Sequence, residues 1–158
     1  MQIPFLAWLL QGLPEAIGIA AVMYSVAGFG LRWRTIVPVG ILFGVAFYLI
    51  RLLPIAFGVN TLLNFLLIVL VFQKATSCRL ALAIRSGLAA LIIVVVAENL
   101  FFILFVSALG LDTEAIYNIL WLRLLVSWPN VIVLFTVAVI YNSMLNRRVN
   151  KENQVEYK

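Results

Sequence analysis

Five long apolar stretches, separated by short polar segments, constrain the fold more than any other feature of the sequence. Each is close to the roughly 20 residues that a helix needs to cross the hydrocarbon layer of a bilayer. Lipid cannot satisfy backbone polar groups, so segments that cross it this way must be helical. We therefore expect an all-α, polytopic transmembrane helix bundle over residues 1–145 and a polar cytoplasmic tail over 146–158. The expected spans are about 4–28, 35–53, 55–72, 86–109 and 116–145.

The second and third stretches are almost continuous, interrupted only around Pro54. One helix of their combined length would extend well beyond a hydrocarbon layer of about 30 Å. We therefore predict two helices joined by a tight turn near Pro54 to Asn60.

The composition leaves little room for a domain in water. Hydrophobic residues make up 65% of the chain and charged residues 11%, whereas about a quarter of a soluble domain is charged. The net charge of +5 comes from basic residues between or after the apolar stretches. The lipid bilayer is therefore the expected partner of these cations, and nucleic acid is not.

Basic residues in the loops predict the orientation of the bundle. Short cytoplasmic loops of membrane proteins are enriched in Lys and Arg. With the N-terminus outside, three basic segments would share the cytoplasmic side, and Arg51 would be the one basic residue of the opposite loops. We predict an N-out, C-in, multi-pass protein of the plasma membrane. The basic segments contain Arg32, Arg34, Lys74, Arg79, Arg147, Arg148, Lys151 and Lys158.

Several classes of chemistry lack the residues they require. The chain has no histidine, one cysteine (Cys78) and one aspartate (Asp112). Imidazole catalysis, an internal disulfide and a two-aspartate protease are therefore ruled out. No nucleotide-binding glycine loop or zinc motif is present. We expect no enzyme activity, no cofactor and no metal site.

Four ionisable side chains lie within or at the edge of the apolar stretches: Glu15, Arg51, Glu98 and Arg123. At about 1.5 Å per residue, Glu15 and Glu98 would each lie roughly 16 Å below the outer boundary. A charge at such depth costs about 2.5 to 3.5 kcal/mol on insertion scales. The four should therefore face the bundle interior, for instance as the pairs Glu98 with Arg123 and Glu15 with Arg51.

Other polar residues share helix faces with these charges, because positions three, four or seven apart lie on one side of a helix. Together they predict an outward-opening polar pocket that binds a ligand or holds an intramembrane charge network. The alternative is that the polar groups join helices by hydrogen bonds, and that Gly40 and Gly44 allow close packing. The candidate site residues are Gln11, Glu15, Arg51, Asn60, Asn64, Glu98, Arg123, Ser127 and Asn130.

Three prolines are candidate hinges: Pro14, Pro54 and Pro129. A proline inside a spanning helix frees a backbone carbonyl one turn earlier, which can become a ligand or a flexible point. The alternative is that each proline only kinks its helix, and that the bundle tolerates the kink.

Four features of the sequence together resemble a known group of proteins. They are the segment Gln11-Gly12-Leu13-Pro14-Glu15, the segment Arg51 to Gly58, Glu98, and Arg123 ahead of Pro129. The chain resembles small multispanning membrane proteins of Gram-positive, Clostridia-type bacteria, which are similar to the membrane sensor regions of peptide quorum-sensing histidine kinases. The resemblance implies a ligand-sensing or signalling accessory module without a kinase domain. Its output would need a cytoplasmic or membrane partner chain.

Three functions remain open. The leading hypothesis is a sensor whose pocket binds a peptide or small molecule. The second is a transporter of a small molecule or ion, or its substrate-binding subunit, coupled to protons or cations through the buried glutamates. The third is a structural assembly factor of the membrane.

Overall fold

The computed structural model describes residues 8–53, 57–109 and 120–156, and these residues are almost entirely helical. A π-helical turn, η1 (Trp8–Gly12), continues into α2 (Leu13–Val26). The other helices are α3 (Trp33–Arg51), α4 (Phe57–Thr76), α5 (Leu80–Leu109) and α7 (Leu120–Glu156). Five helical segments of the described residues are long and apolar enough to cross a membrane. The predicted all-α bundle of five spans is confirmed at this level.

The loop between the third and fourth spans is shorter than predicted. Helix α4 continues to Thr76 and α5 begins at Leu80, where the hydropathy had suggested ends at 72 and 86. Polar residues such as Lys74 and Arg85 end the apolar stretches, but they do not interrupt helical hydrogen bonding. The chain reverses over three residues, and Ser77 adopts a positive φ of 52° in the turn.

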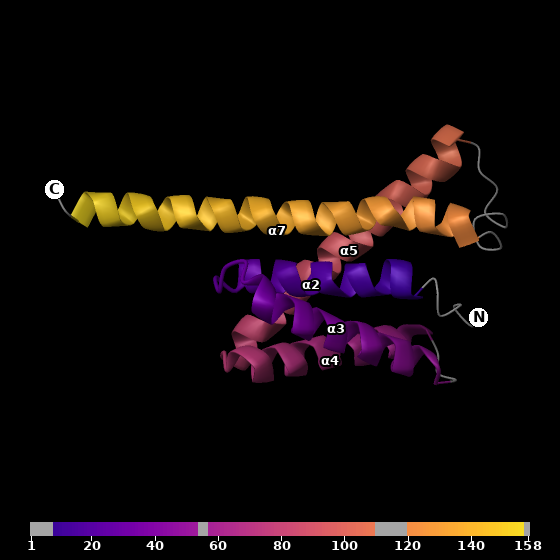
Figure 1. Ribbon diagram of the computed structural model, residues 1–158, viewed down its shortest axis with the longest axis horizontal. Coiled ribbons are helices and arrows are strands. Elements are labelled where there is room, and N and C mark those ends of the chain that lie inside the picture. Colours follow the sequence, from indigo (N-terminus) through magenta and orange to yellow (C-terminus); the bar gives the residue numbers. More distant parts are fainter. Residues whose placement is uncertain (1–7, 54–56, 110–119, 157–158) are drawn as a thin grey trace.

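Helix α7 is longer than a membrane span. Its 37 residues correspond to about 55 Å, whereas the hydrocarbon layer is about 30 Å thick. It continues through Pro129 and into the segment predicted as a polar tail, as far as Glu156. Figure 1 shows it as one nearly straight rod that projects beyond the other helices. Helix α3 ends at Arg51 and helix α4 begins at Phe57. The predicted hinge Pro54 lies outside the described residues.

Helix α2 is the centre of the bundle, since it packs against α3, α5 and α7. Small side chains let its neighbours approach closely, and Ala16, Ala20 and Ala21 are fully buried. The closest approach is at Gly40 of α3, where an added Cβ would lie 2.5 Å from the Cα of Ile17. The packing role considered for Gly40 is therefore observed.

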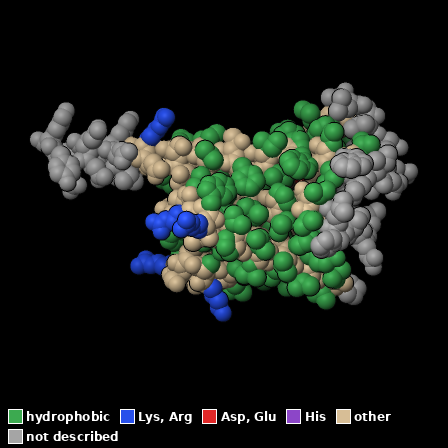
Figure 2. Space-filling model, viewed as in Figure 1, with side chains coloured by type: hydrophobic (Ala, Val, Ile, Leu, Met, Phe, Trp, Pro, Cys, Tyr) green, Lys and Arg blue, Asp and Glu red, His purple; other side chains and the backbone are tan. Residues whose placement is uncertain are grey.

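Exposed basic side chains gather at one end of the bundle, which we call the basic end. It is formed by the α2–α3 and α4–α5 connections and by α7 near residue 147, since successive helices run in opposite directions (Figure 1). Figure 2 shows Lys and Arg at this end of the visible face, while hydrophobic side chains cover its middle. The basic segments predicted to share one side of the membrane therefore do lie together. The exposed cations include Arg32, Arg34, Lys74, Arg79, Arg85 and Arg147.

Helix α5 crosses the other helices obliquely (Figure 1). It contacts α4, α2 and α7, and its 30 residues correspond to about 45 Å. Inclination fits a helix of this length into an apolar layer of about 30 Å. Helices α2, α3, α4 and α7 run nearly parallel to one another in the same view.

Candidate functional site: a polar cavity between four helices

A cavity of about 320 Å³ lies between four elements: the continuous segment of η1 and α2, and the helices α3, α4 and α5. Its volume is at the lower end of the range of small-molecule sites, roughly 300 to 1,000 Å³. It occupies the half of the bundle away from the basic end, where α2 begins, α3 ends and α4 begins. The lining residues are Trp8, Gln11, Gly12, Glu15, Ala16, Ile19, Phe47, Arg51, Asn60, Thr61, Asn64, Phe65, Ile68, Leu91, Val94, Val95 and Glu98.

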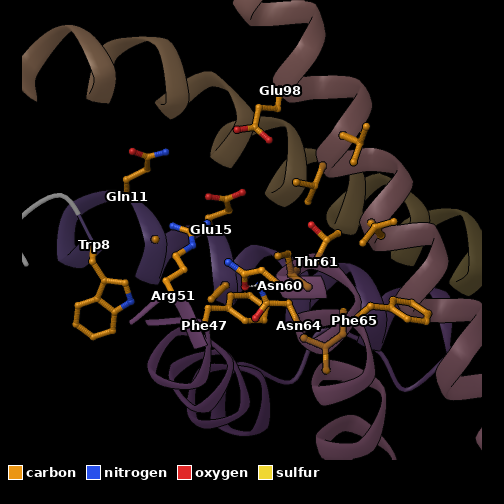
Figure 3. Close-up of a pocket in the computed structure, with 17 residues that line it drawn as sticks. Trp8, Gln11, Glu15, Phe47, Arg51, Asn60, Thr61, Asn64, Phe65 and Glu98 are labelled. Carbon is orange, nitrogen blue, oxygen red and sulfur yellow. Dashed lines mark hydrogen bonds between the residues drawn. The ribbon is translucent and has the colours of Figure 1, made fainter. Parts of the chain in front are cut away.

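Most of the candidate residues from the sequence meet in this cavity. Figure 3 shows that the polar ends of Gln11, Glu15, Arg51 and Glu98 point into the same space, although the residues come from different helices. The sequence spacing had predicted their common depth, and the fold brings them together around one chamber. The candidates that line it are Gln11, Glu15, Arg51, Asn60, Asn64 and Glu98.

Glu15 connects the cavity to α7, a helix none of whose described side chains lines it. It lies in the first turn of α2, where an acidic side chain suits the positive end of the helix dipole. The side-chain amide of Asn130, on α7, donates a hydrogen bond of 3.3 Å to the Glu15 carboxylate. Asn130 is only 3% exposed and its carbonyl oxygen has no hydrogen-bond partner among the described residues. The pair is therefore a buried polar contact between the cavity wall and α7.

Arg51 is the last residue of α3, an end of the helix where a cation is favourable. Its guanidinium points towards the Glu15 carboxylate (Figure 3). The described residues show no direct hydrogen bond or ion pair between the two groups. The two groups therefore line the same cavity without a direct polar contact to each other.

Glu98 faces these groups from α5 and is exposed. Its expected partner Arg123 has a side chain outside the described part of the structure, so the predicted Glu98–Arg123 pair stays a prediction. The next residue, Asn99, points away from the cavity and its amide donates to the Val95 carbonyl on its own helix, at 2.7 Å. Only Glu98 of the Glu98-Asn99 dipeptide contributes to the site.

Asn60 and Asn64 occupy successive turns of α4. The Asn64 amide nitrogen donates to the Asn60 side-chain oxygen at 3.2 Å, which is the dashed line in Figure 3. This hydrogen bond fixes the Asn64 amide, yet its own oxygen is buried without a partner among the described residues. A buried acceptor that lacks a donor costs about 1 to 3 kcal/mol, so the site presents an acceptor for a ligand to satisfy.

The sequence interpretation left Trp8 out of the candidate site. Its indole N–H donates to the Gly44 carbonyl at 2.9 Å, and its ring lies 5.1 Å from that of Tyr48. These contacts hold η1 against α3 at the cavity wall. Trp8, Gln11 and Glu15 are spaced three and four residues apart, which is typical of one helix face. The apolar lining residues, such as Phe47, gave no signal that separates them from core residues.

The remaining candidates lie elsewhere. Ser127 is half-buried on α7 and does not line the cavity. Pro14 is the second residue of α2, between the π-helical turn and Glu15, and the helix of Pro129 is continuous. Pro14 is therefore the hinge candidate that adjoins the cavity, and its hinge role stays a prediction.

Tightly packed side chains close the bundle between the cavity and the basic end. Tyr24 and Phe72 are buried, and with Phe29 they form an aromatic cluster with ring centroids 5.2 to 6.2 Å apart. The hydroxyl of Ser25 donates to the Ala138 carbonyl of α7 at 3.0 Å at the same level. The cavity therefore does not continue as an open path through the described residues.

Among the residues that the structure describes, no group of three metal-ligating side chains comes together. The arrangement instead offers two carboxylates, one guanidinium and several amides to a small charged ligand. Comparison with protein-family models, curated proteins and solved structures found no match.

Proposed function

We propose that the chain is a ligand-sensing membrane module, in which the cavity binds a small ligand and α7 transmits its presence to the basic end. The observation that carries the proposal is the position of Glu15, which lines the cavity and also accepts a hydrogen bond from Asn130 of α7. A ligand that binds Glu15 therefore acts on a residue that is hydrogen-bonded to α7. The resemblance to membrane sensor regions of quorum-sensing kinases agrees with the proposal.

The direction of signalling follows from the charges. We place the basic end in the cytoplasm of a plasma-membrane protein, because short cytoplasmic loops are enriched in Lys and Arg. The cavity then lies in the outer half of the bundle. Helix α7 extends past the basic end to Glu156, and we assign this extension to contact with a partner chain.

A transport function is the main alternative, because two carboxylates within the spans can exchange protons or bind cations. The aromatic cluster of Tyr24, Phe29 and Phe72 favours the sensor, since a carrier would have to open this cluster in each transport cycle. The third hypothesis is a structural assembly factor. In that case, filling the cavity would have no effect on the basic end.

A substitution that fills the cavity tests the relay without a known ligand. Val95 lines the cavity and is 47% exposed, whereas the adjacent Val96 does not line it and is 59% exposed. Nitroxide labels on Cys78 and on Arg147→Cys report the spacing of the α4–α5 loop and α7. We expect Val95→Trp to shift the mean label distance by about 2 Å, the scale of helix movements in switching proteins.

The control variant Val96→Trp should leave the distance unchanged. Equal distance distributions for Val95→Trp, Val96→Trp and the labelled parent would contradict the sensor proposal. In sealed proteoliposomes, the sensor should show no proton or sodium flux. A gradient-driven flux that Glu98→Gln abolishes would establish the carrier instead.

A further inference from the structure

The cavity has a buried floor and an exposed rim. Its floor is closed, since Ala16 is fully buried and Ile68 is 4% exposed. Its rim is exposed and comes from three helices: Arg51 at the end of α3, Thr61 on α4, and Val95 and Glu98 on α5. Figure 3 shows α5 with Glu98 on the opposite side of this space from Arg51 and α4.

On α4 and α5, the exposed rim lies within apolar, membrane-length segments. Val95 lies 15 residues from the start of α5, about 22 Å along a helix whose apolar span runs from Leu80 to Ser107. Exposed apolar side chains flank the rim on both helices, with Leu62 at 58% and Leu66 at 47% on α4 and Ile92 at 59% on α5. A ligand that reaches the cavity across this part of the rim passes apolar side chains, which favours a molecule with an apolar tail.

The charges and hydrogen-bonding groups of the cavity select the polar part of such a ligand. Among the lining side chains that the structure describes, two carboxylates, Glu15 and Glu98, face a single guanidinium, Arg51. A complementary headgroup has a positive group for the carboxylates and an anionic group for Arg51, which binds phosphate and carboxylate in a fork geometry. The Asn64 oxygen, which has no partner among the described residues, can accept a hydrogen bond from a ligand, as can the carboxylates. A primary ammonium satisfies these acceptors, whereas a quaternary ammonium has no N–H to donate.

We infer that the cavity takes a single-chain amphiphile with a zwitterionic headgroup, which bears a primary ammonium and a phosphate or carboxylate, and that this ligand enters from the bilayer between α4 and α5. The ammonium lies between Glu15, Glu98 and the Asn64 oxygen, and the anionic group lies at Arg51. The apolar tail leaves along the exposed faces of α4 and α5. This inference rests on the proposed ligand-binding role of the cavity.

Fluorescence of Trp8, which lines the cavity, provides the binding measurement. The protein in maltoside micelles has Trp8 as its single tryptophan after Trp33, Trp121 and Trp128 are replaced by Phe. The probes are lysophosphatidylethanolamine, lysophosphatidylcholine, lysophosphatidylglycerol and free phosphoethanolamine. We expect lysophosphatidylethanolamine to bind at least about tenfold more tightly than each of the other three, a difference of about 1.4 kcal/mol.

Glu98→Gln and Asn64→Leu should each weaken the binding of lysophosphatidylethanolamine at least about tenfold, while Asn99→Leu, which removes an amide outside the cavity, should not change it. Equal affinity for the ethanolamine and choline headgroups would contradict the role of the N–H acceptors. Equal affinity for free phosphoethanolamine would contradict entry from the bilayer. If no probe binds but Val95→Trp still shifts the label distance, the ligand class is wrong and the sensor proposal stands.

Discussion

The side-chain amide of Asn130, on α7, donates a hydrogen bond to the Glu15 carboxylate across 3.3 Å, although none of the described side chains of α7 lines the cavity. The contact joins residues 115 positions apart and lies next to Pro14, at the start of the central helix. A change at Glu15 therefore acts on a direct contact with α7, the helix that extends past the basic end.

Removal of this hydrogen bond should destabilise the bundle. We expect Asn130→Leu to lower the free energy of unfolding by about 1 kcal/mol, because the Glu15 carboxylate loses its donor and membrane hydrogen bonds have this size. Unfolding in mixed micelles measures the effect. Thr136→Val is the control, since the Thr136 hydroxyl is exposed and bonds only to the Ile132 carbonyl of its own helix. Equal free energies of unfolding for the two variants would show that this hydrogen bond does not stabilise the bundle.

The close approach of α2 and α3 depends on a glycine. An added Cβ at Gly40 would lie 2.5 Å from the Ile17 Cα, whereas a Cβ at Gly58 would meet no described atom within 4 Å. We expect Gly40→Ala to destabilise the protein by about 1 to 3 kcal/mol through overpacking. Gly58→Ala should be neutral or slightly stabilising. Thermal unfolding of both variants tests the packing, and a Gly40→Ala protein as stable as its parent would show that the helices do not pack this closely.

The contact of Trp8 with α3 should be needed to hold the π-helical turn in place. Trp8→Phe removes the N–H that donates to Gly44 but retains an aromatic ring near Tyr48. We expect a loss of about 0.5 to 1.5 kcal/mol, the usual net value of a hydrogen bond. Trp33→Phe serves as the control, because Trp33 is 45% exposed and its ring packs on Phe135. A larger loss for Trp33→Phe than for Trp8→Phe would contradict this role.

The orientation predicts opposite labelling at the two ends of the bundle. In a Cys78→Ala background, a membrane-impermeant maleimide should label Leu53→Cys in intact cells and Arg32→Cys only in inverted vesicles. Both positions are exposed. Labelling of Arg32→Cys from outside would reverse the orientation and place the cavity in the inner half.

Hydropathy predicted the number of spans because the bilayer imposes an apolar length on each helix. The helices α4, α5 and α7 extend beyond the predicted spans, since helical hydrogen bonding continues where the apolar pattern stops. The residue spacing found Gln11, Glu15, Asn60 and Asn64 because polar side chains avoid lipid. It could not assign neighbours among the helices, because lipid makes every apolar helix face similar.

Glu98 shows the same limit at a single residue. Its charge indicated an interior position, but the structure places it at an exposed rim of the cavity. The oblique course of α5 determines this place, and no local sequence pattern encodes the inclination of a helix relative to its neighbours. The apolar residues Phe47 and Phe65 likewise line the cavity without a distinctive signal.

The central claim is that α2, α3, α4 and α5 enclose a polar, accessible cavity, and cysteine reactivity tests it most directly. Asn64→Cys, in a Cys78→Ala background, is compared with Leu62→Cys, which lies on the same helix but does not line the cavity. Asn64→Cys should react readily with a small methanethiosulfonate reagent, and faster with a cationic than with an anionic one, because two carboxylates outnumber one guanidinium. Leu62→Cys should react slowly, since lipid suppresses the thiolate. Equal, slow reaction at both positions would contradict the account.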